Sequence, residues 1–287
     1  MVGEGMRRLG IVFFLLAFVA QPAAAAPATL MARLQNELSM LVTSKTSDVG
    51  VAAVDLTTGE AVSVRGNQRY PMASTVKVAV AATYLAYVEK GDRSLDDTIS
   101  GVSAAALMRR MLVHSDNHAT DLLIRDLGGP KTVQKWLDWH NVKGLRIDRT
   151  INQLLTDKRD LYDERDSATP MAFATFLTRL DKGELLRPWS KNYLLDLMAQ
   201  CMTGRNRMKS LLPDGTRVEH KTGTLNGLTD DVGFITLPNG HRIAVAIFAR
   251  GGTNRPNAIA EAARTIYDGF LSIVGWPYTS ASAISGR

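Results

Sequence analysis

A serine and a lysine in the first third of the chain have the spacing of an activated nucleophile. Ser74 and Lys77 are three residues apart in a segment with the apolar, alanine-rich character of a buried helix, so both side chains would project from one helix face. A serine hydroxyl is a weak nucleophile until a base takes its proton, and a lysine desolvated beside other cations can act as that base. The pair therefore indicates nucleophilic catalysis, although an ordinary helix start could produce the same spacing.

Two tripeptides later in the chain add a second hydroxyl and a second amine. The first is Ser115-Asp116-Asn117, and the second is Lys221-Thr222-Gly223 on a segment with strand character. An exact tripeptide is much rarer by chance than a serine–lysine pair. Together with Ser74 and Lys77, the two tripeptides predict a reaction centre assembled from three distant parts of the chain.

These motifs, in this order, resemble those of the class A β-lactamases, which share them with penicillin-binding proteins. The resemblance spans essentially all of the chain after its first 26 residues. Residues 71–77 look like the family's nucleophile segment, residues 128–130 like the turn after the next helix, and residues 166–170 like the exit from its active-site loop. Residues 202–213 are similar to the family's approach to the final strand motif.

The resemblance implies a catalytic role for each of the four side chains. Ser74 would attack the amide carbonyl and become acylated, with Lys77 as its base or as part of its proton relay. Ser115, held near Lys221, would return a proton to the leaving nitrogen. The backbone N–H groups of Ser74 and Thr224 would form the oxyanion hole. No metal and no cofactor is implied.

The resemblance also implies a set of substrate-binding residues. Asn117 would hydrogen-bond Lys77 and the side-chain amide of the substrate, while Lys221 and Thr222 would attract its carboxylate. Arg207 matches a position from which some members supply an arginine to that carboxylate, and a plain surface arginine is the alternative. The implied binding residues are Asn117, Thr222, Gly223, Thr224 and Arg207.

The chain departs from the family where a glutamate activates the water that releases the acyl group. Counting forward from Arg149 places Ile151 at this position, and counting back from Asp166 places Gln153 there, because the loop is two residues longer than usual. Neither register supplies a glutamate. Arg149 and Asp166 are expected to form a salt bridge across the neck of the loop, and Asp157 is the candidate replacement base, with Asp160 as the alternative.

Three functions remain open on this reading. The leading expectation is a serine β-lactamase that opens β-lactam rings. A D-alanyl-D-alanine carboxypeptidase or related peptide hydrolase acting on peptidoglycan stem peptides is the second, and a penicillin-binding sensor that stays acylated is the third. The stretch of only 37 residues between Lys77 and Ser115 predicts an open pocket, which would suit the last two.

Strand-like segments occur near both ends of the chain and helical patterns between them. Residues 49–56, 61–65, 216–224, 229–237 and 241–249 read as strands, the last two joined by a Pro-Asn-Gly turn. This order predicts an α/β fold of the β-lactamase/transpeptidase type, an antiparallel sheet flanked by helices with an inserted helical domain. We expect residues 27–70 and 205–287 in the sheet domain and residues 71–204 in the helical domain.

Composition and the N-terminal residues indicate an exported protein. Residues 1–26 have the basic, apolar and alanine-rich pattern of a secretory signal peptide, which predicts a periplasmic or secreted protein with no lasting membrane span. The positive residues behind the net charge of +6 are scattered among acidic ones, so we expect no nucleic-acid partner. We also expect a monomer. Cys201, the single cysteine, is read as a small buried hydrophobe.

Three further features are set aside as structural. His114 and His118 are four residues apart, but they flank the Ser-Asp-Asn motif and are not expected to bind a metal. His220 should point away from Lys221, because successive strand side chains face opposite sides of a sheet. Trp136 and Trp139 are at helical spacing and are assigned to the core.

Overall fold

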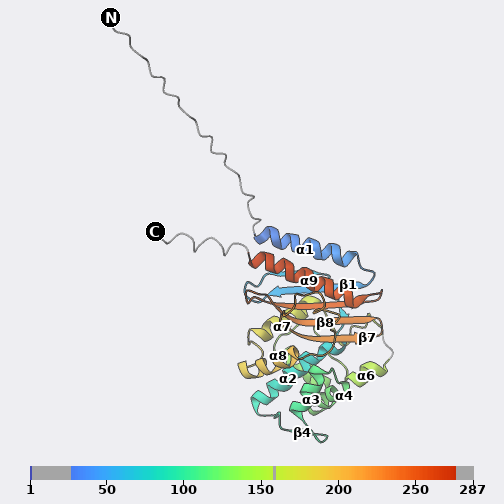
Figure 1. Ribbon diagram of the computed structural model, residues 1–287. Helices are drawn as coiled ribbons and strands as arrows, with labels where there is room; N and C mark the ends of the chain where they lie inside the picture. Colours follow the sequence, from blue (N-terminus) through green and yellow to red (C-terminus); the bar gives the residue numbers. More distant parts are fainter. Residues whose placement is uncertain (2–26, 158–159, 276–287) are drawn as a thin grey trace.

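A five-stranded antiparallel sheet forms the centre of the molecule (Figure 1). The structure is a computed structural model that describes residue 1 and residues 27–157 and 160–275, so the predicted signal peptide lies almost wholly outside the described residues. The strand order is β2-β1-β9-β8-β7, which joins strands from both ends of the chain and leaves β7 at one edge. The strands are β1 (Asp48–Asp55), β2 (Ala61–Val64), β7 (Val218–Leu225), β8 (Leu228–Thr236) and β9 (Arg242–Arg250).

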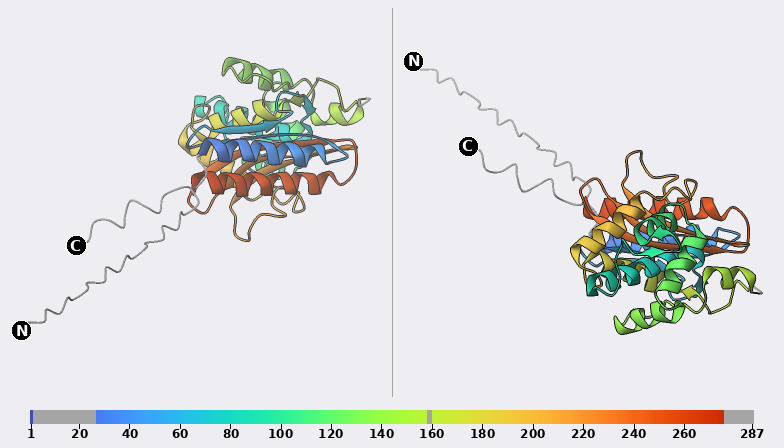
Figure 2. Two further views of the ribbon diagram at one scale, coloured as in Figure 1. Left: turned by 90° about the horizontal axis from the view of Figure 1, so that it is seen from above. Right: turned by 90° about the horizontal axis from the view of Figure 1, so that it is seen from below.

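Helices cover both faces of this sheet. On one face α1 (Pro27–Thr43) and α9 (Arg255–Val274) lie side by side (Figures 1 and 2). The other face packs against α7 (Pro170–Asp181), and α8 (Pro188–Ala199) contacts the edge strand β7. The remaining helices pack on α8 and on one another, and they are α2 (Lys77–Lys90), α3 (Ala104–Val113), α4 (Asn117–Asp126), α5 (Pro130–Trp139) and α6 (Ile151–Thr156). The predicted β-lactamase/transpeptidase-like architecture is confirmed.

Two hydrophobic cores fill the spaces between these layers. Because side chains alternate along a strand, β1 directs Val49 and Val51 toward α1 and α9, and Ala52 and Val54 toward the helices of the other face. Strands β1 and β9 carry charged residues only at their ends because both of their faces are buried, whereas the central strand β8 also buries Asp230 and Asp231. The cores hold the sheet rigid, and its edge strand β7 carries the Lys-Thr-Gly motif.

Short elements without a periodic pattern escaped prediction. They are the two-residue strand pairs β3 (Tyr70–Pro71) with β6 (Ser167–Ala168), and β4 (Thr98–Ile99) with β5 (Val102–Ser103), together with α6. The β3–β6 pair ties the segment before Ser74 to the end of the active-site loop. No helix among the residues that the structure describes is long and apolar enough to cross a membrane.

One of the two tryptophans assigned to the core is exposed. Trp136 is buried, with 4% of its surface exposed, but Trp139 is 87% exposed. Both lie on α5, and Trp139 falls at the last residue of that helix, beyond its contact with α2 and α4. The prediction for Trp139 is therefore wrong, because helical spacing alone does not show where a packed helix face ends.

Candidate active site

Ser74 lies in a short 3₁₀ turn, η1 (Ala73–Val76), that leads directly into α2. The turn is fixed by Thr75, whose backbone N–H and hydroxyl both donate to the Met72 carbonyl at 2.9 and 2.7 Å. Ala73 has a φ of 46°, a left-handed conformation that costs a non-glycine residue about 1–3 kcal/mol. The surrounding residues of the turn are buried while Ser74 is partly exposed, so the strained turn presents the Ser74 hydroxyl outward.

The η1 turn packs against the Lys-Thr-Gly segment of β7. A Cβ atom placed on Gly223 would come within 2.8 Å of the Met72 carbonyl oxygen and 3.1 Å of the Ala73 Cβ atom. Only glycine therefore allows the strand to approach the nucleophile's turn this closely. The backbones of Ser74 and Thr224, the two predicted oxyanion-hole residues, belong to these two adjoining segments.

The hydroxyl of Ser115 lies between the two lysine side chains of the motifs. Lys77 Nζ is 3.2 Å and Lys221 Nζ is 2.9 Å from Ser115 Oγ. Lys77 Nζ also donates to the Ser115 carbonyl at 2.6 Å, and Ser115 itself has a left-handed φ of 59°. When both lysines are charged they occupy the lone pairs of Ser115 Oγ, which leaves the hydroxyl proton free for another acceptor.

Both lysine side chains are fully buried, and this changes their basicity. Burial, followed by the charge of Lys221, lowers the pKa of Lys77 to about 7. Burial also lowers the pKa of Lys221, to about 8. About half of Lys77 is therefore neutral at pH 7 while Lys221 is mostly charged. The site thus combines an amine that can accept a proton with a second amine that keeps its charge.

The Ser-Asp-Asn segment connects α3 to α4 and holds these groups in place. Asn117 Oδ1 accepts a hydrogen bond from Lys77 Nζ at 2.7 Å, as the family resemblance implies. Asp116 is the N-cap of α4, since its carboxylate accepts from Ala119 N at 2.9 Å, and it pairs with Arg110 at 2.6 Å. The carboxylate of Asp116 is thus engaged by the loop and by the start of α4.

Arg207 lies against the end of the Lys-Thr-Gly strand. Its Nη1 atom donates to the carbonyl oxygens of Gly223 and Asp230 at 2.8 and 2.9 Å, and Nη2 donates to Thr224 Oγ1 at 2.7 Å. Burial lowers the pKa of Arg207, but an arginine side chain stays charged in proteins. The arginine therefore places a positive charge beside Thr224. Thr222, by contrast, directs its hydroxyl to Thr203 at 2.5 Å.

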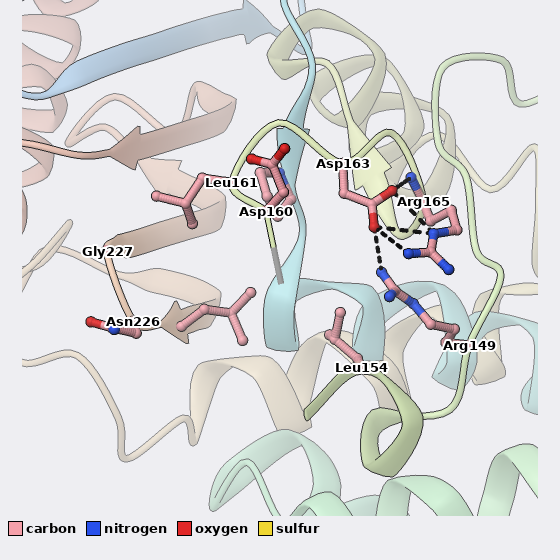
Figure 3. A pocket seen from close by; sticks show the side chains of 10 residues that line it. Arg149, Leu154, Asp160, Leu161, Asp163, Arg165, Asn226 and Gly227 are labelled. Atoms are coloured by element: carbon pink, nitrogen blue, oxygen red, sulfur yellow. Dashed lines mark hydrogen bonds and ion pairs between the residues drawn. The ribbon is translucent and has the colours of Figure 1, made fainter. Parts of the chain in front are cut away.

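Arg149 is the centre of the active-site loop. Its Nε atom donates to Asp166 at 2.5 Å, which confirms the predicted salt bridge across the loop's neck. The other guanidinium nitrogens contact Asp157 at 3.1 Å and Asp163 at 3.4 Å (Figure 3 shows the Asp163 contact). Asp163 also pairs with Arg165, at 2.7 Å. Asp157, the candidate deacylation base, is therefore held by an arginine in this structure.

The start of α6 occupies the position where the family's glutamate was sought. Ile151 is buried in the helical core, and its N–H donates to Asp121 Oδ1 at 2.7 Å. Gln153 Oε1 accepts from Thr150 N at 2.9 Å, which forms a capping box at the N-terminus of α6. Asp121 was missed at the sequence level because its partners lie about thirty residues away. The threonine and glutamine three residues apart are a local signal that would have predicted this helix start.

A pocket of about 340 Å³ opens between the loop and the β7–β8 turn. Figure 3 shows that side chains of the loop line one side of it and that Asn226, just beyond Thr224, lies on the other. Charged residues of both signs line the loop side, among them Asp160 and Arg165. Among the described residues its lining includes Leu225 but none of Ser74, Lys77, Ser115 and Lys221, so this pocket is a cavity of the loop and not the acylation site itself.

The comparison with known proteins identifies relatives along most of the chain. Residues 32–270 match the family model described as the beta-lactamase enzyme family. The β-lactamase VEB-1 of Pseudomonas aeruginosa is 28% identical over 273 residues, covering 85% of this chain and 89% of VEB-1. The carbapenem-hydrolyzing β-lactamase KPC of Klebsiella oxytoca is 27% identical over 281 residues, covering 89% of this chain and 95% of KPC.

Solved structures give the same result at the level of the fold. An ancestral (GNCA) class A β-lactamase aligns with a TM-score of 0.79 at 31% identity, covering 83% of this chain and 100% of that chain. The TLA-3 extended-spectrum β-lactamase aligns with a TM-score of 0.78 at 28% identity, covering 84% and 99%. Sequence and fold therefore point to one group of proteins.

Proposed function

The chain belongs to class A of the β-lactamase enzyme family, and from this premise we propose that it opens β-lactam rings through an ester on Ser74. One observation carries the proposal: Lys77 and Lys221, both buried, donate to the same Ser115 hydroxyl. Two buried ammonium groups about a hydroxyl are costly to assemble, because burial disfavours both charges and their mutual repulsion adds to that cost. Such an arrangement is expected where proton transfer requires it.

The proposed acylation begins with the neutral form of Lys77. This amine takes the proton of the Ser74 hydroxyl, and Ser74 Oγ attacks the carbonyl carbon of the β-lactam ring. The oxygen that becomes negative accepts hydrogen bonds from the backbone N–H groups of Ser74 and Thr224. The C–N bond then breaks, and the ring nitrogen takes the Ser115 hydroxyl proton, which is replaced through the adjacent lysines.

The positively charged side chains of the site are proposed to orient the substrate. Lys221 and Arg207 attract the substrate carboxylate, and the hydroxyl of Thr224, already bound to Arg207, adds a hydrogen bond. Asn117 holds Lys77 through its Oδ1 atom and offers its amide nitrogen to the substrate's side chain. Thr222 and Gly223 are assigned to binding through the strand that they form, since glycine lets this strand approach the η1 turn.

We further propose that the chain lacks the glutamate with which the family releases its acyl group. The support is the sequence, where Ile151 and Gln153 are the two residues that could occupy the position, and the engagement of Gln153 in the capping box. Asp157 is the proposed replacement base, and reaching the ester would require it to leave Arg149. Deacylation should therefore be slower than acylation.

The engaged loop carboxylates favour a second candidate function. If Asp157 keeps its ion pair with Arg149, water must attack the ester without a positioned proton acceptor, and Ser74 remains acylated. The chain would then act as a penicillin-binding sensor. A D-alanyl-D-alanine carboxypeptidase would require in addition that water releases the ester formed from the peptide, though not the ester formed from a β-lactam. From the N-terminal pattern of residues 1–26 we propose export to the periplasm or beyond, and a monomer is the proposed state.

Turnover of a chromogenic cephalosporin tests this function. We expect the wild-type chain to form product beyond one equivalent, because a slow deacylation still returns free Ser74. The Ser74→Ala variant, which keeps the fold, should form none. A burst that stops at one equivalent would reject the β-lactamase in favour of the sensor or the carboxypeptidase, and hydrolysis of an acyl-D-alanyl-D-alanine peptide would then separate those two.

A further inference from the structure

A histidine and an aspartate form a buried pair on one face of the Lys-Thr-Gly strand, and a cysteine covers the same face, outside the proposed acylation machinery. Asp231 Oδ1 binds His220 Nδ1 at 2.8 Å, and both side chains are fully buried. The second ring nitrogen, His220 Nε2, is also buried and has no hydrogen-bond partner among the described residues. The Cys201 Sγ atom lies 3.3 Å from Thr203 Oγ1, and Thr203 contacts Thr222, whose side chain is on the same face of β7 as that of His220.

The charges around Cys201 favour a thiolate. Burial by itself would raise the pKa of the Cys201 thiol, but its interaction with His220, with a contribution from Lys221, lowers the pKa to about 6. Burial likewise opposes the charge of His220, but Asp231 and then Cys201 raise its pKa to about 9. Arg207 adds a further positive charge near the cluster, while the neighbouring Asp230, whose pKa burial raises well above its ordinary value, faces the opposite side of the sheet from Asp231. A thiolate here therefore faces three cations and one carboxylate.

We propose that Cys201 is a reactive thiol that His220 and Asp231 activate for modification by hydrogen peroxide and other small electrophiles. The aspartate holds Nδ1 of the imidazole, which leaves Nε2 buried and without a hydrogen-bond partner among the described residues, on the strand face that Cys201 and Thr203 cover. Cys201 keeps 7% of its surface exposed, and its neighbour Met202 is 56% exposed, so a small molecule has a short path to the sulfur. Cys201 is buried, as expected from the sequence, and the proposal adds reactivity to it.

The oxidation that we propose is a two-electron step. The Cys201 thiolate attacks one oxygen of hydrogen peroxide, an S–O bond forms and the O–O bond breaks. The departing hydroxide takes a proton from the His220 imidazolium and leaves as water. The sulfur is oxidised to a sulfenic acid and the peroxide is reduced.

Modification of Cys201 would act on the acylation site through one line of contacts. Thr203 Oγ1, which touches Cys201, is 2.5 Å from Thr222 Oγ1, and the Thr222 carbonyl accepts from Lys221 Nζ at 2.9 Å. The space between these segments is tight, since a Cβ atom on Gly204 would lie 2.4 Å from Thr222 Cγ2. An added oxygen should therefore displace the strand that carries Lys221. This consequence, unlike the thiol reactivity, rests on the proposed function.

The reactivity is tested by the pH dependence of alkylation in the full chain. Iodoacetamide labelling of Cys201, followed by peptide mass spectrometry from pH 5 to 9.5, should reach half its maximal rate near pH 6. The same thiol in the urea-unfolded chain should do so near pH 8.5, the ordinary value for cysteine. At pH 6.5 these values correspond to about three-quarters and about one hundredth thiolate. The midpoint is the deciding quantity, because burial and lower nucleophilicity both reduce the absolute rate.

Substitutions of the activating residues provide the controls. His220→Asn should raise the midpoint by more than one pH unit, and Asp231→Asn should raise it less, while circular dichroism verifies the fold of each. Peroxide at pH 6.5 should give a dimedone adduct on Cys201 in the wild type, and none should form in Cys201→Ser. A native midpoint at pH 8 or above, an unchanged midpoint in folded His220→Asn, or the absence of the dimedone adduct would overturn the proposal.

A second readout follows the coupling to Ser74. Peroxide should slow formation of a fluorescent-penicillin adduct in the wild type but not in Cys201→Ser, and dithiothreitol should restore the rate. Equal slowing in both proteins would overturn the coupling. If untreated wild type forms no penicillin adduct, the proposed function fails, and the alkylation profile still decides the reactivity of Cys201.

Discussion

Removal of the Lys221 charge should shift the pH at which Ser74 becomes acylated. Lys77 acts as the base only when neutral, so the acylation rate should rise with pH around its pKa of about 7. Lys221 is needed in its charged form, so the rate should fall again as its pKa of about 8 is passed. The acylation rate of the wild type, plotted against pH, should thus follow a narrow bell-shaped curve, whose two limbs report the coupled titration of both lysines. In Lys221→Met the length and burial of the side chain are retained while its charge is lost.

The size of the shift follows from the geometry of Ser115. Both ammonium groups contact the same hydroxyl oxygen, at 3.2 and 2.9 Å, so they are at most about 6 Å apart. At that distance two unit charges repel by about 0.7 kcal/mol in water and by about 2.8 kcal/mol at an effective dielectric constant of about 20. This repulsion corresponds to a change of about 0.5 to 2 units in the pKa of Lys77. The rising limb should therefore move up to between about pH 7.5 and 9, and the falling limb should disappear.

The assay is the rate of covalent labelling by a fluorescent penicillin between pH 5.5 and 9.5, measured in single-turnover experiments. At pH 7 the neutral fraction of Lys77 should fall from about one half to between about one quarter and one hundredth. Loss of substrate binding in Lys221→Met lowers the rate at every pH, but it does not move the limb. A rising limb at the same pH in wild type and variant would refute the proposed electrostatic coupling.

Three further predictions concern the base, the loop and its candidate carboxylate. In quenched-flow labelling, Lys77→Ala should slow formation of the penicillin adduct by about 10²- to 10⁴-fold, while the lifetime of the adduct should not become longer. An unchanged rate of formation would exclude Lys77 as the base. If Asp157 activates water, Asp157→Asn should accumulate acylated Ser74 in intact-mass spectra, and unchanged turnover would remove Asp157 from the mechanism. Arg149→Ala leaves the buried Asp166 carboxylate without its partner, so it should lower the free energy of unfolding by about 3 kcal/mol or more in urea titrations. A loss below about 1 kcal/mol would show that the neck of the loop does not depend on this ion pair.

The sheet and the motif positions were predictable because they depend on repeating patterns. Strands β7, β8 and β9 begin and end within two residues of the predicted ranges, since their alternation and the Pro-Asn-Gly turn are local signals. The convergence of Ser115 and Lys221 followed from the motif order of the family. Elements of two residues, such as β3 and β6, contain no period and form only because their partner is nearby in the fold.

The environment of Cys201 depended on neighbours distant in sequence. His220 and Asp231 face the same side of adjacent strands, and the alternation rule correctly directed His220 away from Lys221. The rule gives the face of a sheet, but not the segment that covers it, and here that segment carries Cys201. The left-handed backbone of Ala73 was likewise not predictable, because the Gly223 segment that lies close to it is about 150 residues away in the sequence.

The central claim is that Ser74 is acylated by β-lactams, and mass spectrometry of the intact chain tests it most directly. After incubation with a penicillin and rapid acid quenching, the wild type should gain the mass of one penicillin, and peptide mapping should place that mass on Ser74. Ser74→Ala should gain none. An adduct on another residue, or an equal adduct in Ser74→Ala, would contradict the account.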